Sequence, residues 1–261
     1  MLRPRLIPCL LVKNNGLVKT VNFKSPKYVG DPINAVRIFN EKSVDEIVVL
    51  DIDASVLGKE PDYALIEKLA SECRMPLCYG GGVKTVEQAE RIFSLGVEKV
   101  AISAAAVVDP DLITRISKNV GSQSLVVVID AKFSKKHGVY EMWIHNGTKN
   151  TGIEVVGFAK QIEKLGAGEI VINSIDNDGA MMGYDMKLVD LVRVAISIPM
   201  SALGGAGSKT DIAMLINKFG IIGAMAGSMF VFKGVYKAVL ISYLNKEDKF
   251  DLIREHTRSL F

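Results

Sequence analysis

Three aspartates, Asp51, Asp130 and Asp176, stand where short apolar runs of the sequence end. A continuous β-branched run is typical of a strand buried on both faces, and a carboxylate at its end lies at the edge of the sheet. Burial there can raise the pKa of a carboxyl group into the range of general acid–base catalysis. Asp130 closes the uncharged run Val126–Ile129 and is the preferred catalytic candidate. Asp51 and Asp176 fit a catalytic role and a loop-ordering role about equally.

Two glycine-rich turns have the composition of phosphate-binding turns. Gly80–Gly82 and Gly204–Gly207 each follow an apolar run and precede a helical pattern, which exposes backbone N–H groups at the start of a helix. A second turn of small residues follows the next apolar run in each case, at Ser103–Ala106 and Ala226–Ser228. One such turn could merely reverse the chain, but two at matched positions favour a ligand with two phosphoryl groups.

Four charged residues, Arg5, Glu46, Lys99 and Glu169, stand at the opposite ends of apolar runs and alternate in sign. In a barrel these strand ends converge at one end of the axis, and charges buried there must be paired. We therefore expect a ring of ion pairs. The ring either closes the floor of the barrel or gates the passage of a small neutral molecule along the axis.

The bulk composition narrows the possible functions. The chain has 261 residues, a formal charge of +3 and only short basic clusters, which gives no nucleic-acid footprint. Three cysteines without CxxC spacing predict a reduced, cytoplasmic setting without a disulfide framework. The histidines, His137, His145 and His256, are scattered, so we expect no histidine metal site and no cofactor. We also expect no signal segment and no membrane span.

Apolar runs alternate with helical patterns about eight times, as in βα units. The pattern predicts a (β/α)8 TIM barrel over residues 1–245, and an open doubly wound sheet is the alternative. A helical tail is expected over 246–261, with Phe250, Ile253 and Leu260 facing inward. The expected strands are Arg5–Leu11, Glu46–Ile52, Pro76–Tyr79, Lys99–Ser103, Ser124–Asp130, Glu169–Ser174, Pro199–Leu203 and Ile221–Ala224.

An internal repeat divides the barrel into two halves, about 1–120 and 121–245. The segment that begins at Glu46 recurs at Glu169, an offset of 169 − 46 = 123 residues. The glycine turns recur with an offset of 204 − 80 = 124 residues. Two halves of four βα units each are the economical interpretation of this repeat.

The first strand of each half repeats as well, and the two copies differ at one chemically important position. Aligning Lys13 with Lys132 places Leu11 opposite Asp130. One half therefore carries an acid at its strand end, and the other carries a leucine.

The chain resembles the cyclase subunit of imidazole glycerol phosphate synthase, HisF, over residues 1 to 240. The motifs that carry the resemblance are Arg5, Ile7–Leu10, Lys19 with Asn22–Lys24, Gly30–Pro32, Asp51, Gly80–Gly82, Asp130–Lys132, Asn150–Gly152, Ser174–Asp176, Asp178–Gly179 and Gly204–Gly207. The family implies a barrel that docks a HisH-like glutamine amidotransferase on its N-terminal face. Ammonia would enter through a charged gate that Arg5, Glu46, Lys99 and Glu169 match. It would then react at the opposite face with a bisphosphorylated ribulosyl aminoimidazole carboxamide.

The resemblance also implies which residues contact this phosphorylated ligand. They are Lys19, Gly81, Gly82, Ser103, Ala104, Asp178, Gly179, Gly205, Gly227 and Ser228.

The sequence departs from the family pattern where the reaction takes place. The family uses two strand-end aspartates as acid and base, and Leu11 replaces the partner of Asp130. Ser103–Ala104 stands where the family has Asn–Thr, Phe133 where Arg is usual, and Leu203 where Ser or Cys is usual. The charged residues at the floor of the barrel, where the strands begin, thus match the family pattern, whereas residues at the mouth, where the strands end, differ from it. This combination indicates a changed ligand.

Three functions remain open on this evidence. The altered mouth resembles HisF-like paralogues of surface-polysaccharide pathways, which are thought to supply ammonia to an N-sugar amidotransferase that makes acetamidino groups. The alternative is a working cyclase in histidine biosynthesis, supported by most of the motifs. A phosphoribosyl isomerase is the third, and it lacks the charged gate and the Asn22–Phe23–Lys24 loop.

Overall fold

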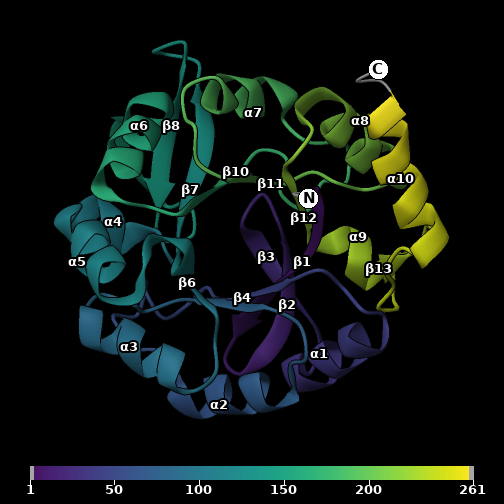
Figure 1. The fold of residues 1–261 in the computed structure, drawn as a ribbon, viewed down its shortest axis with the longest axis horizontal. Helices are drawn as coiled ribbons and strands as arrows, with labels where there is room; N and C mark the ends of the chain where they lie inside the picture. The colour runs from purple at the N-terminus through teal and green to yellow at the C-terminus, as the bar shows by residue number, and fades with distance from the viewer. Residues whose placement is uncertain (1–2, 259–261) are drawn as a thin grey trace.

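Eight parallel strands form a closed barrel in the computed structural model, which describes residues 3–258 and the side chains of residues 3–252. Each strand pairs with the next around the barrel, and β12 pairs with β1 to close it. This confirms the predicted (β/α)8 barrel, and each of the eight barrel strands overlaps its expected segment (Figure 1). The parallel strands are β1 (Arg5–Lys13), β4 (Ile47–Asp51), β5 (Leu77–Gly80), β6 (Lys99–Ile102), β7 (Leu125–Ser134), β10 (Glu169–Ser174), β11 (Met200–Leu203) and β12 (Gly223–Ala226).

Helices surround the barrel, and side chains at their first residues fix where several of them begin. Asp31 accepts a hydrogen bond from the backbone N–H of Asn34, and Ser208 and Asp211 form a capping box. The outer layer consists of α1 (Pro32–Glu41), α2 (Tyr63–Glu72), α3 (Val86–Ser94), α4 (Ala104–Val108), α5 (Asp111–Val120), α6 (Val155–Leu165), α7 (Met186–Arg193), α8 (Lys209–Phe219) and α9 (Ser228–Val231), with a 3₁₀ turn at Ser122–Ser124.

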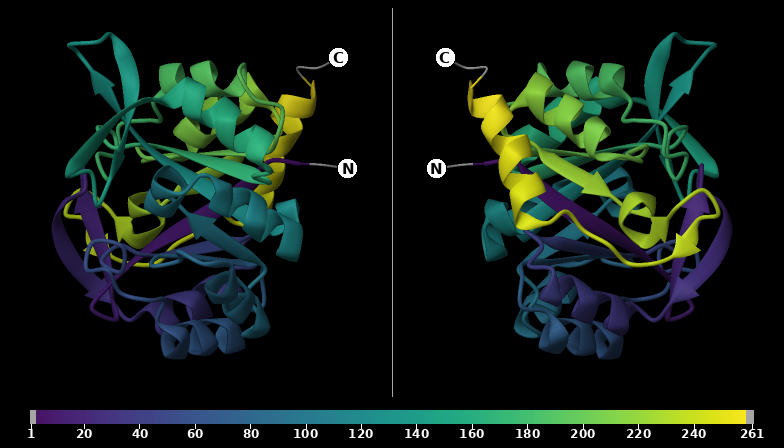
Figure 2. Two further views of the ribbon diagram at one scale, coloured as in Figure 1. Left: turned by 90° about the vertical axis from the view of Figure 1, so that its left-hand side faces the viewer. Right: turned by 90° about the vertical axis from the view of Figure 1, so that its right-hand side faces the viewer.

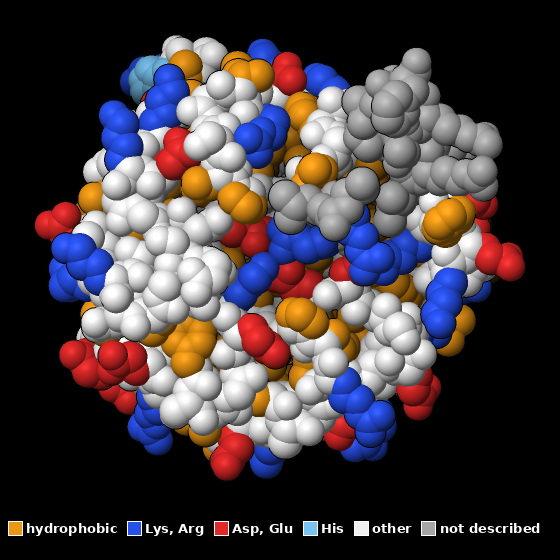
Figure 3. Space-filling view, in the orientation of Figure 1, with side chains coloured by type: hydrophobic (Ala, Val, Ile, Leu, Met, Phe, Trp, Pro, Cys, Tyr) orange, Lys and Arg blue, Asp and Glu red, His pale blue; other side chains and the backbone are white. Residues whose placement is uncertain are grey.

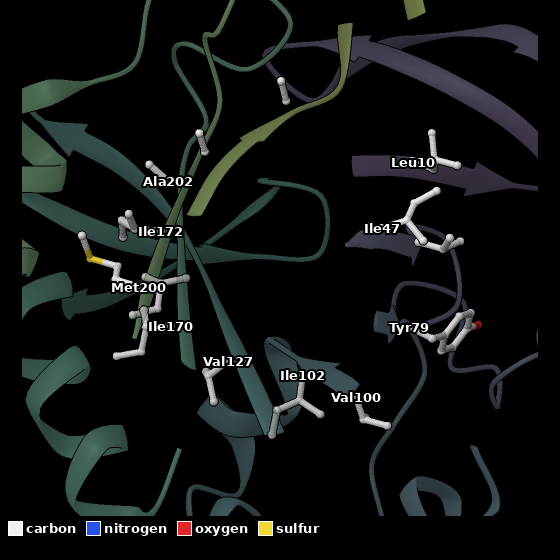
Figure 4. Close-up of a cluster of buried hydrophobic side chains, with 14 of the residues drawn as sticks. Leu10, Ile47, Tyr79, Val100, Ile102, Val127, Ile170, Ile172, Met200 and Ala202 are labelled. Carbon is white, nitrogen blue, oxygen red and sulfur yellow. The ribbon is translucent and has the colours of Figure 1, made fainter. Parts of the chain in front are cut away.

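Alternate residues of each strand pack into two separate cores. On β4, Ile47 and Val49 face the helices, whereas Val48 faces the interior of the barrel. Figure 4 shows members of the outer core, among them Ile47 and Val127. The interior core is small and apolar, and consists of Ile7, Cys9, Val48, Cys78, Ala101, Val126, Val128, Val171, Leu203 and Met225.

Two β-hairpins that the sequence analysis did not predict extend from matched strands of the two halves. β1 continues into β2 (Gly16–Val21) and β3 (Lys24–Gly30), and β7 continues into β8 (Val139–Ile144) and β9 (Lys149–Glu154). Both project from the end of the barrel opposite the N-terminus (Figure 2). They deepen the mouth of the barrel at the carboxyl ends of the strands.

The C-terminal helix α10 (Lys246–Arg258) is fastened to the floor of the barrel, where the strands begin. Nζ of Lys249 lies 2.5 Å from Oδ1 of Asp45, and the Tyr243 hydroxyl donates to the carbonyl of Leu6 at 2.8 Å. The expectation that Phe250 faces inward is wrong, because its side chain is 61% exposed and Leu252 is the buried residue instead. Leu252 packs inward because Lys249 and Tyr243 fix which side of the helix meets the barrel. The side chains of Ile253 and Leu260 lie outside the described residues.

Candidate functional site

A cavity opens at the carboxyl ends of the strands and collects most of the predicted site residues. Its lining includes the predicted residues Asp51, Asp130, Lys19, Gly81, Gly82, Ser103, Ala104, Asp178, Gly227 and Ser228, together with Leu11. Gly179, Gly205 and Asp176 are not among the lining residues. The cavity therefore lies where (β/α)8 barrels carry their active sites.

Asp130 lies within β7, where the strand begins to pair with β8, and is hydrogen-bonded to the neighbouring strand β10. Nδ2 of Asn173, its register partner on β10, donates to Oδ1 of Asp130 at 2.9 Å. Burial raises the pKa of Asp130 to about 7, against the hydrogen bond from Asn173, which lowers it. A carboxyl group with this pKa can both donate and accept a proton near neutral pH.

Leu11 lines the same cavity from β1. It is in register with Leu50 of β4, and both side chains pack against the interior core. The position that the internal repeat equates with Asp130 is thus part of an aliphatic surface. Neither of these two side chains can donate or accept a proton.

A buried lysine and a buried aspartate lie together on one wall of the cavity. Nζ of Lys19 donates to the carbonyl of Cys9 at 2.7 Å, and the Thr20 hydroxyl donates to Oδ2 of Asp178 at 3.1 Å. Burial lowers the pKa of Lys19, although Asp178 acts in the opposite direction. Burial likewise raises the pKa of Asp178 against the effects of Lys19 and Thr20. Burial therefore disfavours the charged form of each group, and the attraction between them offsets part of this effect.

The other two strand-end aspartates have different surroundings. Oδ1 of Asp51 accepts hydrogen bonds from the backbone N–H groups of Asp53 and Ala54 at 3.0 and 3.1 Å, so Asp51 orders its own turn at the cavity wall. Burial raises the pKa of Asp51. Asp176 is half exposed outside the cavity and lies 3.8 Å from Nζ of Lys132.

The two glycine-rich turns are not equivalent in the structure. Gly81 and Gly82 line the cavity beside Ser103 and Ala104. In the second turn the carboxylate of Asp211 accepts from the backbone N–H groups of Gly207 and Ser208, both at 2.9 Å. Those N–H groups are already satisfied without a phosphate, so on this side the cavity presents only the turn at Gly227 and Ser228.

Gly205 and Gly179 pack against backbone instead of lining the cavity. A Cβ on Gly205 would lie 2.0 Å from the carbonyl oxygen of Gly183, and one on Gly179 would lie 2.0 Å from that of Thr20. In the structure, both glycines therefore allow close packing of the backbone. Their sequence motifs alone do not distinguish this role from ligand binding.

Arg5, Glu46, Lys99 and Glu169 form a closed ring of ion pairs at the floor. Arg5 lies 2.5 Å from Glu46 and 2.6 Å from Glu169, and Lys99 lies 2.9 Å from each of the two glutamates. Lys, Arg, Asp and Glu side chains gather at the centre of the face on which the N-terminus lies (Figure 3). The four side chains thus meet across the axis of the barrel.

Mutual attraction keeps the ring ionised although it is buried. Burial acts to lower the pKa of Arg5, but Glu169 and Glu46 raise it overall. Burial acts to raise the pKa of Glu169, but Arg5 and Lys99 hold it at about 2. The Ser201 hydroxyl adds a hydrogen bond to Glu169 at 2.6 Å. Two cations balance two anions, which is what a buried charge cluster requires.

A narrow apolar cavity lies between the ring and the mouth. Glu46 and Glu169 line it at the floor, and Leu50, Ala101 and Val128 line both this cavity and the one at the mouth. Between these ends it is lined by Ile7, Val48, Cys78, Val126, Val171 and Met225.

Some residues of the mouth were not identified as site residues from the sequence. Asn173 lies in the repeated segment that begins at Glu169, and its hydrogen bond to Asp130 depends on pairing between β7 and β10. His145 was noted only as one of three scattered histidines. Its ring lines the cavity from the turn between β8 and β9, with Nδ1 buried and without a hydrogen-bond partner among the described residues. His145 could not be assigned to the site from the sequence because the β8–β9 hairpin that carries it was not predicted.

Among the described side chains, those of residues 3–252, no three His, Cys, Asp or Glu residues are grouped so that they could hold a metal ion. Within residues 3–258, no helix is both long and apolar enough to cross a membrane.

A strand-end carboxylate over a cavity at the carboxyl ends of the strands is the arrangement of a (β/α)8-barrel enzyme. Residues 5–237 match the family model described as histidine biosynthesis protein, and the chain belongs to this family.

The relatives carry the name imidazole glycerol phosphate synthase subunit HisF. A Vibrio vulnificus protein provisionally named subunit hisF3 is 56% identical over 95% of this chain and 96% of its own length. A Pseudomonas aeruginosa protein provisionally named subunit hisF2 is 53% identical over 95% of this chain and 99% of its own length. The HisF subunit of Lactococcus lactis subsp. cremoris is 43% identical over 88% of this chain and 89% of its own length.

Proposed function

We propose that this chain is a synthase subunit of the HisF type that receives ammonia from a HisH-like glutamine amidotransferase docked on its N-terminal face. Its own cyclase activity is weakened because Leu11 replaces the second acid, and it serves as a paralogue in the synthesis of acetamidino sugars. The single observation that carries the proposal is the combination of a complete ion-pair ring with an aliphatic residue opposite Asp130.

The interior of the barrel suits neutral ammonia and excludes ammonium. An unpaired cation in an apolar passage lined by residues such as Val48, Val126 and Val171 would be strongly disfavoured. Ammonia carries no charge and is small enough to pass once the ring side chains move apart. The ring would therefore act as a gate that opens when the glutaminase is docked.

The mouth supports ligand binding better than it supports a cyclisation that needs two proton-handling groups. Asp130 can serve as one acid or base, whereas Leu11 can serve as neither. Loss of one such group typically costs ~10²–10⁴ in rate. Ammonia that is not consumed here would pass to an N-sugar amidotransferase, which binds the acceptor sugar.

The comparisons support the paralogue interpretation through the names of the relatives. Proteins at 53% to 56% identity carry provisional or numbered HisF names, whereas the Lactococcus HisF subunit is 43% identical. The free thiols of Cys9, Cys73 and Cys78 support a reducing, cytoplasmic setting.

The second candidate is a working cyclase of histidine biosynthesis. It is favoured by Asp130, whose pKa of about 7 suits general acid–base catalysis, and by Lys19 and Asp178 on the cavity wall. A phosphoribosyl isomerase has less support, because it has no use for the ring and the apolar passage.

Reconstitution with the histidine-pathway substrate tests the proposal. The chain and its glutaminase are incubated with bisphosphorylated ribulosyl aminoimidazole carboxamide, with glutamine or with ammonium chloride as the nitrogen source. We expect strong glutamine hydrolysis and little imidazole glycerol phosphate, and a gain of at least tenfold with Leu11→Asp. Leu11→Asn is the matched control, since asparagine has nearly the same size as aspartate and is also polar but has no ionisable group. Turnover by the unmodified chain at the rate of a histidine-pathway cyclase would contradict the proposal.

A further inference from the structure

An exposed apolar hairpin follows helix α9, which begins at the turn formed by Gly227 and Ser228. Strands β13 (Phe232–Lys233) and β14 (Ala238–Val239) form a separate two-stranded sheet. At its tip Val235 is 94% exposed and Tyr236 is 98% exposed. A two-stranded hairpin is only marginally stable by itself, and a contiguous apolar patch on a surface commonly marks an interaction site.

The hairpin lies beside the β2–β3 hairpin at the rim of the mouth. Nζ of Lys27 is 6.0 Å from the centre of the Phe232 ring, and Tyr28 on β3 is also exposed. Figure 2 shows both hairpins at the end of the barrel opposite the N-terminus. We call this surface the rim patch; it consists of Lys24, Lys27, Tyr28, Lys233, Val235, Tyr236 and Lys237.

The rim patch carries charge of one sign only. Its four lysines are exposed, and the two segments that form it, residues 16–30 and 228–244, contain no aspartate or glutamate. Aromatic and apolar side chains surrounded by lysines match a partner with an apolar centre and an acidic border.

We propose that the rim patch is the docking surface for an acidic-faced protein that consumes the ammonia leaving the mouth. This inference rests on the proposed function, in which the glutaminase covers the floor and nitrogen leaves at the opposite end. A partner seated on the rim receives ammonia before it is protonated in bulk water. Tyr236 is the apolar anchor of the contact, and the lysines orient the partner.

Charge disfavours a second copy of this chain as the occupant. A twofold interface through the rim patch would place lysines against lysines. An anionic membrane would match the charge, but it would block the opening through which the nitrogen must leave. An acidic protein fits both the charge and the route.

The first experiment identifies the occupant with a photo-crosslinking amino acid, p-benzoylphenylalanine, placed at position 236 of the full chain in cells that also make the glutaminase. The matched control carries the same group at position 108, because Val108 is 78% exposed on α4 in the other half of the barrel. We expect an acidic protein crosslinked from position 236 and not from position 108. Crosslinks to a second copy of this chain, or to lipid alone, would overturn the inference.

The second experiment measures transfer with the captured protein in purified form. With glutaminase and glutamine, we expect Val235→Asp and Lys237→Glu each to lower amination of the acceptor at least tenfold. Amination from added ammonium chloride and the rate of glutamine hydrolysis should not change. Val108→Asp and Lys118→Glu are the matched controls, and both should transfer as the unmodified chain does.

The outcomes separate this inference from the proposed function. If the unmodified chain transfers nitrogen from glutamine and the rim variants do so within twofold of it, the docking surface is wrong and the proposed function stands. If the unmodified chain gives no glutamine-dependent transfer to the captured protein, the proposed function fails with it. Cosedimentation of the unmodified chain, but not of Lys237→Glu, with phosphatidylglycerol vesicles would overturn the protein partner in favour of a membrane.

Discussion

Asn173 on β10 donates a hydrogen bond to Asp130 on β7 at 2.9 Å, between two residues paired at the same level of the parallel sheet. The contact joins two strands that are 43 positions apart in the sequence and holds the carboxyl group toward the mouth. Asn173 stabilises the ionised form of Asp130, whereas burial opposes it more strongly. The result is a carboxyl group that changes its charge near neutral pH.

The raised pKa of Asp130 predicts how stability depends on pH. The pKa rises from 3.8 to about 7 on folding, so the folded chain holds the proton more tightly and loses stability as pH rises from about 4 to 7. Asp130→Asn removes this penalty and should raise the free energy of unfolding at pH 8 by on the order of a few kcal/mol. Urea unfolding at pH 8 and pH 4 measures it, and the difference between the two chains should vanish at pH 4. An equal difference at both pH values would contradict the pKa of Asp130.

The ring predicts the opposite dependence on pH. The pKa of Glu169 falls from 4.5 to about 2 on folding, so its ionisation contributes stability that is present above pH 4.5 and is lost toward pH 2. Glu169→Gln should therefore destabilise the chain at pH 7 by roughly 2–4 kcal/mol, because Arg5 and Lys99 lose one of their two counter-ions.

Urea unfolding of Glu169→Gln at pH 7 and pH 3 measures this effect. Glu72→Gln is the matched control, since Glu72 pairs with Arg37 at the exposed surface and should change stability far less. A penalty for Glu169→Gln that is as large at pH 3 as at pH 7 would mean that packing, and not charge, holds the ring together.

Two glycines near the mouth should differ sharply when each is replaced by alanine. In Gly205→Ala the new Cβ would meet the Gly183 carbonyl oxygen at 2.0 Å, and Gly205 has a φ of 110°, which alanine rarely adopts. In Gly227→Ala the nearest atom is Nζ of Lys19 at 2.5 Å, the far end of a flexible side chain. We expect Gly205→Ala to cost roughly 2–4 kcal/mol and Gly227→Ala less than about 1 kcal/mol, measured by urea unfolding. An equal loss of unfolding free energy in the two variants would contradict the contacts described for the two glycines.

The sequence predicted the barrel because its strands are buried on both faces and are continuously apolar. The run that contains Val126 and Val128 needs no knowledge of its neighbours to be identified as a strand. The hairpins were missed because their strands are partly polar, as in Lys24–Gly30, and they pair only by extending β1 and β7.

Site residues were predictable where local sequence decides their position, and not where tertiary contacts do. Asp130 and the four ring residues stand at strand ends, so the barrel brings each set together. Whether a glycine turn faces a ligand or packs on backbone depends on contacts between distant segments, such as Gly205 with Gly183. Asp176 lies outside the cavity because the chain turns toward Lys132 after β10, which its motif does not reveal.

The apolar passage predicts that two neighbouring residues of β4 will respond differently to the same substitution. Val48 lines the narrow apolar cavity between the ring and the mouth, and Val49 faces the outer helices. Methionine adds volume in either place and should cost stability to a similar degree, about 1–3 kcal/mol. Val48→Met should also obstruct ammonia, whereas Val49→Met should not.

The test of the passage is the ratio of glutamine-dependent to ammonium-dependent amination of the acceptor. Added ammonium chloride supplies nitrogen at the mouth and bypasses the passage. We expect the ratio to fall at least tenfold for Val48→Met and to stay within twofold for Val49→Met, with glutamine hydrolysis unchanged in both. Because both variants should carry a similar stability cost, a difference between their ratios is expected to come from the passage and not from unfolding. Equal ratios would show that nitrogen reaches the mouth by another route, and the ring would then serve only to close the floor of the barrel.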